Sequence, residues 1–286
     1  MSLSFIAHRN GVWGQSCVAP RFRESELGGF LFACRAFESL HGVECDIRRT
    51  KDNRLIIHHD ATLGLLIRHP FCSFPLSLSS PYAIRVCDVD YSSLRLLFVS
   101  DDKSSPILLD DFLSVMGQLY PDVHLYLELK EEGCEALLFS LLESHERIMD
   151  PRCHILSFSA SILETCDRLR KEVSRKYCLF PHEKRKYLCR LCQNIGWGER
   201  HSPYSFSVFI RDCLMFPENV VSPLVEEANW DWRFFIYHYR TIRKMFPLLK
   251  HGVFTVNRAC ISRILSKYFP LCERIFTDRL DRMICN

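Results

Sequence analysis

Short apolar runs alternate with amphipathic helical patterns along most of this chain. The run from Leu3 to Arg9 is typical of a buried strand, and Glu26 to Leu40 carries apolar residues at helical spacing and ends before Gly42. A second strand pattern begins at Val43. This strand–helix–strand order predicts a βαβ unit, in which the carboxyl ends of parallel strands meet at one edge.

The same alternation continues to the end of the chain. Helical patterns are expected over Leu109 to Leu119, around Leu137 to Leu142, over Ile162 to Val173, over Trp232 to Leu249 and before the last apolar run. Eight buried strands are expected, including Tyr177 to Phe180 and Asn219 to Pro223, and they end near Arg9, Asp46, Lys130, Ser159, Phe180, Pro223, Asn257 and Asp278. The pattern predicts an α/β fold, a (β/α)8 TIM barrel that forms a single domain over residues 1–286.

One hairpin interrupts this alternation. The apolar run Leu55 to Ile57 follows the second strand too soon for a parallel crossover, so the chain is expected to turn back at Asp52-Asn53. If those two residues form the whole loop, His59 lies directly opposite Asp46. The sequence therefore predicts a short antiparallel hairpin inserted near one rim of the barrel.

Composition narrows the class of protein. The chain has 286 residues, 48% of them hydrophobic, and a net charge of +3 from nearly balanced acidic and basic residues, which gives no overall electrostatic case for nucleic acid. Its 15 cysteines follow no repeated spacing and indicate buried reduced thiols rather than a disulfide framework. No signal peptide or membrane span is apparent, so we expect a cytoplasmic protein.

Two further features leave alternatives open. Cys189 and Cys192, with His201 and Cys213, could form a zinc site, but two ordinary thiols on one helical face are the favoured interpretation. The basic run Lys184 to Lys186 is interpreted as a solvated face or as a contact with anionic lipid head groups.

Charged side chains cluster at the predicted carboxyl ends of the strands. Glu44 and Asp46 share one face of a strand, and Glu128 shares a face with Lys130, because side chains two residues apart point the same way. Three neighbouring carboxylates repel one another unless a cation binds them, and oxygen ligands favour Mg²⁺ or Ca²⁺ over zinc. The remaining members of this expected rim cluster are His8, Arg9 and His59. Its cationic residues suit a phosphate group, and its histidines suit acid–base chemistry at phosphorus.

These residues belong to motifs that resemble those of the glycerophosphodiester phosphodiesterase family. The matching stretches, in chain order, are Ile6 to Arg9, Val43 to Ile47, Thr50 to Asp52, Ile57 to Asp60, Leu127 to Lys130, Ser157-Phe158, Phe254 to Asn257 and Ile275 to Asp278. The resemblance implies a metal-dependent barrel hydrolase that cleaves glycerophosphodiesters to sn-glycerol 3-phosphate and an alcohol. Asn10 departs from the family pattern, which has glycine there, and Phe254 replaces the usual tryptophan.

Carried onto this chain, the resemblance implies a role for each cluster member. His8 and His59 correspond to the acid/base pair, and Arg9 and Lys130 correspond to contacts with the substrate phosphate. The implied ligands of a divalent cation are Glu44, Asp46 and Glu128. Two further residues, Glu26 and Phe254, are candidates for the pocket wall.

Two alternative functions remain open. One is a lipid phosphodiesterase of the lysophospholipase D or sphingomyelinase D kind, with an apolar mouth formed by Phe71, Phe74 and the basic segment Lys184 to Lys186. The other is a catalytically inactive barrel that serves as a binding module. The expected partner is a small glycerophosphodiester, with peripheral lipid contact as an option and a monomer or homodimer as the assembly.

Overall fold

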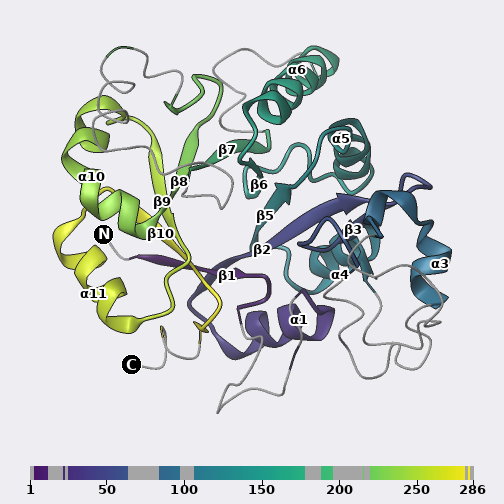
Figure 1. The fold of residues 1–286 in the computed structure, drawn as a ribbon, viewed down its shortest axis with the longest axis horizontal. Helices are drawn as coiled ribbons and strands as arrows, with labels where there is room; N and C mark the ends of the chain where they lie inside the picture. The colour runs from purple at the N-terminus through teal and green to yellow at the C-terminus, as the bar shows by residue number, and fades with distance from the viewer. Residues whose placement is uncertain are drawn as a thin grey trace.

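Eight parallel strands close into a barrel in the computed structural model (Figure 1), which describes residues 3–11, 22, 25–63, 84–96, 106–177, 188–195, 215, 220–280 and 283. The barrel strands are β1 (Ser4–His8), β2 (Leu40–Arg49), β5 (His124–Leu129), β6 (Cys153–Ser157), β7 (Arg190–Ile195), β8 (Glu227–Asp231), β9 (Lys250–Phe254) and β10 (Cys272–Thr277). Strand β1 pairs with β2 on one side and with β10 on the other, which closes the sheet. The predicted (β/α)8 barrel is confirmed.

Helices cover the outside of this barrel (Figure 1). They are α1 (Leu27–Ala36), α4 (Leu109–Leu119), α5 (Glu135–Ser144), α6 (Ala160–Lys176), α10 (Trp232–Met245) and α11 (Ala259–Tyr268). The main apolar core lies between the strands and these helices, where Phe30, Phe112 and Phe235 are fully buried. Each strand thus directs one set of side chains at the helices and the alternate set into the barrel.

The segment between β2 and α4 forms the inserted antiparallel piece. Strand β3 (Leu55–Ile57) pairs with β2, and β4 (Ile107–Leu108) pairs with β3. Two short helices, η2 (Val86–Asp88) and α3 (Tyr91–Leu96), belong to the same region. A separate small core of Ile56, Leu63, Val86 and Leu94 holds it together. The predicted hairpin is therefore present.

Its register differs from the prediction by one residue. Thr50, not Lys51, pairs with Arg54, because the Thr50 N–H donates to the Arg54 carbonyl at 2.9 Å. The loop contains three residues, and its last, Asn53, has φ +58°, a left-handed conformation that asparagine tolerates. As a result His58, not His59, lies opposite Asp46 and donates its backbone N–H to the Asp46 carbonyl at 2.9 Å.

Two of the predicted barrel strands were also wrong. The barrel uses β7 in place of the predicted strand Tyr177 to Phe180. Of that range only Tyr177 is described, and it caps the end of α6. In place of Asn219 to Pro223 the barrel uses β8, whose Glu227 and Asn229 are buried. Both true strands carry polar residues because the barrel interior is partly polar, so an apolar pattern could not identify them.

The cysteine pair lies at the start of a strand rather than on a helix. Cys189 directly precedes β7 and packs in the outer core, whereas Cys192 faces the barrel interior with Tyr126. The two thiols therefore point to opposite sides of the sheet. His201, Cys213, Phe71, Phe74 and Lys184 to Lys186 lie outside the described residues.

An apolar layer crosses the middle of the barrel. It contains Ile6, Tyr126, Leu156, Cys192 and Phe276. Gly252 is needed beside it, since a Cβ there would approach the Asn229 amide oxygen to 2.4 Å. This layer separates a polar cluster at the amino ends of the strands from the pocket at their carboxyl ends. Across the described part of the chain, no helix has the length and apolar character that a membrane crossing requires.

Candidate active site

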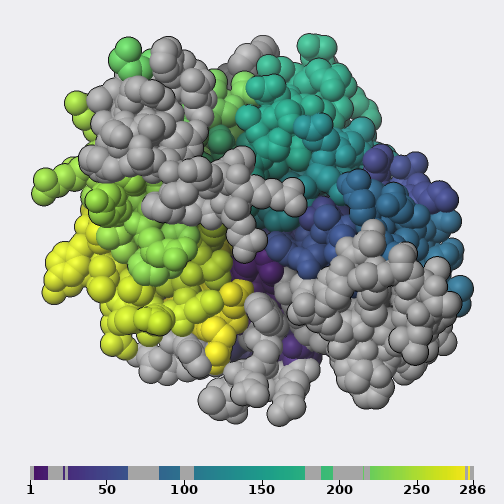
Figure 2. Space-filling view, in the orientation of Figure 1, coloured from purple at the N-terminus to yellow at the C-terminus, as the bar shows by residue number. Residues whose placement is uncertain are grey.

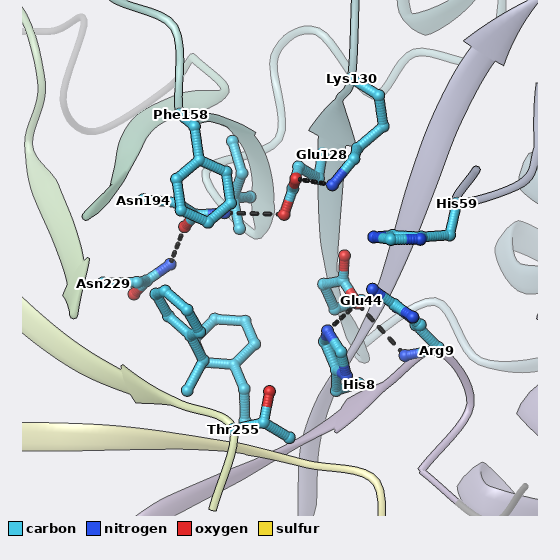
Figure 3. A pocket seen from close by; sticks show the side chains of 13 residues that line it. His8, Arg9, Glu44, His59, Glu128, Lys130, Phe158, Asn194, Asn229 and Thr255 are labelled. Atoms are coloured by element: carbon cyan, nitrogen blue, oxygen red, sulfur yellow. Dashed lines mark hydrogen bonds and ion pairs between the residues drawn. The ribbon is translucent and has the colours of Figure 1, made fainter. Parts of the chain in front are cut away.

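A pocket opens at the carboxyl ends of the barrel strands (Figure 3). Its empty volume is about 570 Å³. The described side chains that line it include six from the predicted cluster, namely His8, Arg9, Glu44, His59, Glu128 and Lys130. The seventh member, Asp46, lies beneath them and forms ion pairs with Arg9 and Lys130. Segments far apart in the sequence thus meet at one end of the barrel.

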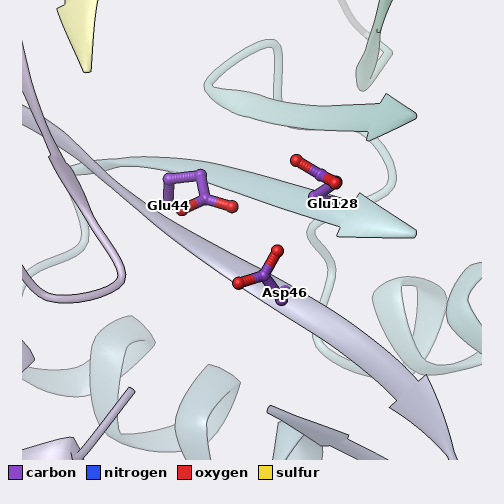
Figure 4. Close-up of side chains that lie close together, drawn as sticks. All are labelled: Glu44, Asp46 and Glu128. Atoms are coloured by element: carbon purple, nitrogen blue, oxygen red, sulfur yellow. The ribbon is translucent and has the colours of Figure 1, made fainter. Parts of the chain in front are cut away.

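Three carboxylates lie together at the base of this pocket (Figure 4). Glu44 and Asp46 come from β2, and Glu128 comes from β5, where it pairs in register with Asp46. One oxygen from each lies within 4.8 Å of the others, and their exposed fractions are 0%, 1% and 6%. Within the described residues no other cluster of metal-ligating side chains is as close.

These carboxylates fit a hard divalent cation. Oxygen is the only donor that they offer, which is the ligand type that Mg²⁺ and Ca²⁺ prefer. In addition, Oε1 of Glu44 is buried and accepts no hydrogen bond within the described structure. A buried carboxylate oxygen without a partner is costly, and a bound cation would remove that cost.

Two cationic side chains border the carboxylates. Arg9 Nε lies 3.0 Å from Asp46 Oδ2, while Lys130 Nζ lies 2.5 Å from Glu128 Oε1 and 3.4 Å from Asp46 Oδ1. Burial alone would raise the pKa of Asp46, but Lys130 and Arg9 outweigh it and lower that pKa. Burial and repulsion from Asp46 raise the pKa of Glu44.

His8 is held by a carboxylate on each side. Its Nδ1 donates to Asp278 Oδ1 at 2.5 Å, and its Nε2 lies 3.7 Å from Glu44 Oε2. Burial would lower the pKa of His8, but the Glu44 and Asp278 carboxylates raise it to about 9. Asn257 in turn donates to Asp278 Oδ2 at 2.9 Å and accepts from the Asp278 backbone N–H. The imidazole orientation is therefore fixed through Nδ1, and Nε2 faces the pocket.

His59 reaches the same wall from the inserted hairpin (Figure 3). Strand β3 ends at Ile57 and His58 still donates its backbone N–H to Asp46, but His59 lies beyond this pairing, so the one-residue register difference does not turn its side chain away. Arg48 Nε donates to the His59 carbonyl at 2.8 Å and fixes this backbone. His59 Nδ1 donates to Asp60 Oδ1 at 2.7 Å, which leaves Nε2 for the pocket.

A tight turn after β1 places Arg9 beside the carboxylates. Arg9, Asn10 and Gly11 have φ values of +49°, +79° and +69°. Asparagine is among the residues that tolerate this left-handed region best, so Asn10 preserves a turn in which the family pattern has glycine. Asn10 is fully buried, and Gly29 of α1 makes room for it, since a Cβ at Gly29 would lie 2.5 Å from the Asn10 amide nitrogen. The backbone N–H of Arg9 donates to Glu44 Oε2 at 3.2 Å.

Two asparagines complete the wall and were absent from the sequence prediction. Asn194 Nδ2 donates to Glu128 Oε2 at 2.8 Å, and Asn229 Nδ2 donates to Asn194 Oδ1 at 3.0 Å. This chain of amides orients Glu128 from the side opposite Lys130. Both residues come from the misassigned strands, so a correct assignment of β7 and β8 would have placed them at the pocket.

The remaining wall is apolar. Phe254 lines the pocket as predicted, with its ring edge-on to Phe158 at a centroid distance of 5.7 Å. Phe158 is partly exposed, and Lys130 Nζ lies 5.8 Å from the centre of its ring. Glu26, the other pocket candidate, caps the start of α1 and is not among the described residues that line the pocket.

The arrangement combines complementary chemical functions in one pocket. Anionic oxygens suited to a cation lie beside guanidinium and ammonium groups suited to a phosphate. Two imidazoles, each anchored through Nδ1 by an aspartate, present Nε2 to the same space. Such a set of groups can bind an anionic ester and can donate and accept protons on it.

Comparisons with known proteins agree with this geometry. The model of the glycerophosphoryl diester phosphodiesterase family matches residues 36–191, and no curated protein matches the sequence. A solved structure of glycerophosphodiester phosphodiesterase from Thermotoga maritima has 17% identity and a TM-score of 0.63, with coverage of 97% of this chain and 95% of that chain. A phosphodiesterase from Oleispira antarctica in complex with the product sn-glycerol-3-phosphate has 18% identity and a TM-score of 0.65, with coverage of 98% and 94%.

The structural likenesses establish the fold, and the sequence match covers more than half of the chain. The matched region begins at the last residue of α1, ends within β7 and includes the three clustered carboxylates. The chain therefore belongs to the glycerophosphoryl diester phosphodiesterase family and is a phosphoric diester hydrolase.

Proposed function

We propose that this chain hydrolyses glycerophosphodiesters to sn-glycerol 3-phosphate and an alcohol, with His8 and His59 as the acid and base. The observation that carries the proposal is the pair of anchored imidazoles beside the carboxylate cluster. The Oleispira antarctica phosphodiesterase, which shares this fold, holds the product sn-glycerol-3-phosphate. That complex supports the same product class for this chain.

A divalent cation, Mg²⁺ or Ca²⁺, belongs to the proposal. Glu44, Asp46 and Glu128 would hold it, since they are the buried oxygen donors that converge. When bound, such a cation supplies positive charge next to the phosphate oxygens. Arg9 and Lys130 are already neutralised in part by the same carboxylates, and they bind the remaining phosphate oxygens.

The histidines move the protons of the reaction. One imidazole Nε2 removes a proton from the nucleophile, which is water or the 2-hydroxyl of the substrate glycerol, as the new P–O bond forms. The other imidazole donates a proton to the alcohol oxygen as the old P–O bond breaks, so no free alkoxide is released. With the glycerol hydroxyl as nucleophile, water then opens the cyclic ester in a second displacement that exchanges the two roles.

Each histidine also needs the correct tautomer, and a neighbouring aspartate sets it. Asp278 and Asp60 accept a hydrogen bond from Nδ1, and this leaves Nε2 as the position that can lose or gain a proton at the substrate. The aspartates are positioning residues in this mechanism.

The decisive test is turnover of glycerophosphocholine, followed by release of sn-glycerol 3-phosphate and choline. We expect His8→Ala and His59→Ala each to lower kcat by about a hundredfold or more, the usual contribution of a general acid or base. The matched control is His145→Ala, which removes a histidine at the end of α5. Wild-type activity in a His8→Ala, His59→Ala double variant would contradict the assignment.

A second substrate tests the lipid alternative in the same assay. Lysophosphatidylcholine has the same phosphodiester and an added acyl chain, so only the mouth of the pocket distinguishes the two substrates. We expect kcat/KM to be higher for glycerophosphocholine, because the apolar residues of the described wall are only Leu156, Phe158, Phe254 and Phe276, while its other lining residues are charged or polar. A preference for the lysophospholipid would establish the lipid phosphodiesterase instead.

Domain extent and location complete the proposal. We propose that residues 1–286 form one domain and that the protein works in the cytoplasm as a monomer or homodimer. All ten cysteines in the described residues are free thiols, and most of them are buried, which suits a reducing compartment. Cell fractionation tests the location, and size-exclusion chromatography with light scattering tests the assembly.

A further inference from the structure

Basic residues are unevenly distributed along this chain. The segment from Trp232 to Cys272 contains eight Lys or Arg residues and no Asp or Glu. The whole chain has 37 basic and 34 acidic residues, so the remainder holds 29 basic and 34 acidic residues. The small net charge of the molecule therefore conceals a strongly positive segment in an otherwise acidic protein.

The fold places this segment on one flank of the barrel. It forms α10, β9 and α11, and the two helices are neighbours because Phe235 and Tyr239 of α10 both contact the ring of Phe269 at the end of α11. All eight cationic side chains are exposed, and we call them the basic flank: Arg233, Arg240, Arg243, Lys244, Lys250, Arg258, Arg263 and Lys267. Figure 2 shows this part of the surface in green to yellow at the left of the view.

The basic flank has almost no counter-charge in the described structure. Arg233 pairs with Asp231 at 3.0 Å, but for the other seven side chains the described residues provide no ion pair. Lys267 instead lies 5.1 Å from the centre of the Tyr268 ring. Like charges that have no ion pair within the described residues repel one another on adjacent helices, and this repulsion favours binding of an anionic partner.

Large apolar side chains are interleaved with these cations. Tyr237 of α10 and Tyr268 of α11 are 73% and 60% exposed, and Leu248, beyond the end of α10, is 95% exposed. Ile264 is exposed on α11 as well. Cations, tyrosines and aliphatic side chains together are the composition of a surface that lies at the boundary between lipid head groups and acyl chains.

We propose that the basic flank and its apolar residues dock this protein on an anionic lipid bilayer. The cations contact lipid phosphates and carboxylates, while Leu248 and the tyrosines enter the head-group layer. A nucleic acid would account for the charge and the tyrosines but not for the exposed aliphatic side chains.

This docking orients the pocket. Helices α10 and α11 run along the outside of the barrel, whereas the pocket opens at its carboxyl end. Leu248 and Tyr268 lie just before the amino ends of β9 and β10, opposite the pocket, so a docked flank leaves the pocket open to water.

The test is cosedimentation of the full chain with vesicles, which requires no turnover. We expect binding to vesicles of phosphatidylcholine mixed with phosphatidylserine, weak binding to phosphatidylcholine alone, and loss of binding at high salt. Reversing one exposed charge on each helix, in Arg240→Glu with Arg263→Glu, should weaken binding by about 30-fold or more, because each basic residue near an anionic surface contributes about fivefold.

A matched control separates position from net charge. Arg95→Glu with Arg168→Glu reverses two exposed arginines on α3 and α6, and lowers the net charge by the same amount. We expect this variant to keep wild-type binding and both double variants to keep wild-type turnover of glycerophosphocholine. Equal loss of vesicle binding in the two variants would overturn the proposal, as would equal binding to neutral and anionic vesicles.

Two further binding measurements identify the class of partner. Leu248→Ser should weaken vesicle binding while leaving the salt dependence unchanged, since it removes apolar contact only. An RNA or DNA oligonucleotide should bind weakly. Strong oligonucleotide binding that depends on Arg240 and Arg263, without vesicle binding, would show that the flank is a nucleic-acid surface and overturn the lipid proposal.

Discussion

His8 and His59 are anchored in the same way, although one follows a barrel strand and the other lies in an insertion. Asp60 is adjacent to His59 in sequence, whereas Asp278 reaches His8 from the last strand and is fixed there by Asn257. Asp278 ends the last family motif, which gives it no role, and its position beside His8 depends on the pairing between β1 and β10. The predicted barrel brings these two strands together, but the sequence does not specify their register, and so it does not show that Asp278 reaches His8.

Asp278→Asn tests this anchoring. The amide keeps the size of the carboxylate but can donate to Nδ1, which favours the tautomer with the proton on Nε2 and so hinders proton transfer at the substrate. We expect kcat for glycerophosphocholine to fall by about a hundredfold, with KM changed little because the proposed phosphate contacts, Arg9 and Lys130, are unaltered.

The control is Asn257→Asp, which keeps an oxygen that can accept from the Asp278 backbone but loses the amide donor to Asp278. A smaller fall in kcat is expected there. A rise in KM with unchanged kcat in Asp278→Asn would mean that Asp278 helps to bind substrate and does not position His8 for proton transfer.

At the scale of elements, the helices were predicted more reliably than the strands. The bounds of α4 agree with the prediction, and α6 and α10 begin within two residues of it, because each buries one stripe of apolar residues. Strands β7 and β8 were missed because Asn194 and Asn229 replace apolar residues inside the barrel. The most polar strands are therefore the ones that contribute to the pocket.

The hairpin register depends on the backbone conformation of Asn53, which sequence patterns do not specify. A two-residue and a three-residue loop both fit Lys51-Asp52-Asn53, and the choice rests on the left-handed conformation of Asn53. The side chain of Asp52 favours the observed loop, because it accepts from the Thr50 hydroxyl at 2.6 Å and from the Tyr91 backbone N–H at 3.0 Å.

Asn53→Ala should destabilise the protein by about 1 kcal/mol, since a residue with a Cβ and no compensating side chain is strained at positive φ. Asn53→Gly should leave the free energy of unfolding within about 0.5 kcal/mol of wild type, because glycine adopts this conformation freely. Urea denaturation of both variants measures the difference. Equal stability of the two would show that the loop does not require the left-handed conformation.

At the scale of the whole molecule, the barrel interior has polar groups at both ends and an apolar layer between them. The carboxylate cluster at one end is a source of instability without a cation, since three buried acids repel one another. Any ion that binds only the folded protein stabilises it, by an amount that grows with the logarithm of the ion concentration once that concentration exceeds Kd.

We therefore expect Mg²⁺ or Ca²⁺ to raise the Tm of the chelator-treated protein, and expect EDTA to abolish turnover. At an ion concentration one hundred times Kd the stabilisation is about 2.7 kcal/mol. Glu128→Gln should reduce the rise in Tm, because one ligand loses its charge. The control Glu227→Gln alters a buried glutamate at the opposite end of the barrel and should keep the ion-dependent rise, whatever its basal stability.

The other end of the barrel carries a histidine chain that predicts acid sensitivity. His154 Nδ1 donates to Glu227 Oε2 at 2.8 Å, so its Nε2 accepts from His124 Nδ1 at 2.9 Å, and His41 stacks on His124 at 4.0 Å between ring centres. Burial lowers the pKa of His41 to about 4, and Arg274, His154 and Lys250 add to this effect. Burial lowers the pKa of His124 to about 3, and His41, His154 and Arg190 add to it. Glu227 opposes both shifts.

Both histidines are thus neutral in the folded protein and take up a proton near pH 6.5 when the chain unfolds. The unfolded state binds more protons than the folded state below this pH, so their contribution to stability is complete above about pH 6.5 and is lost as the pH falls towards 4 and then 3. His124→Asn keeps a donor to His154 and cannot titrate. We expect it to reduce the slope of unfolding free energy against pH between about 6.5 and 4, measured by urea denaturation.

His145→Asn serves as the control, because it removes a histidine outside this chain of rings. If both variants changed the slope equally, the change would follow from removing any histidine, and the acid sensitivity could not be assigned to the polar end of the barrel. If only His124→Asn changes it, the acid sensitivity belongs to the amino end of the barrel, where neutral imidazoles cannot be charged without cost, whereas the proposed cation dependence belongs to the carboxyl end. The apolar layer of Ile6, Tyr126 and Phe276 keeps these two charged regions apart, which is the condition for tuning one without disturbing the other.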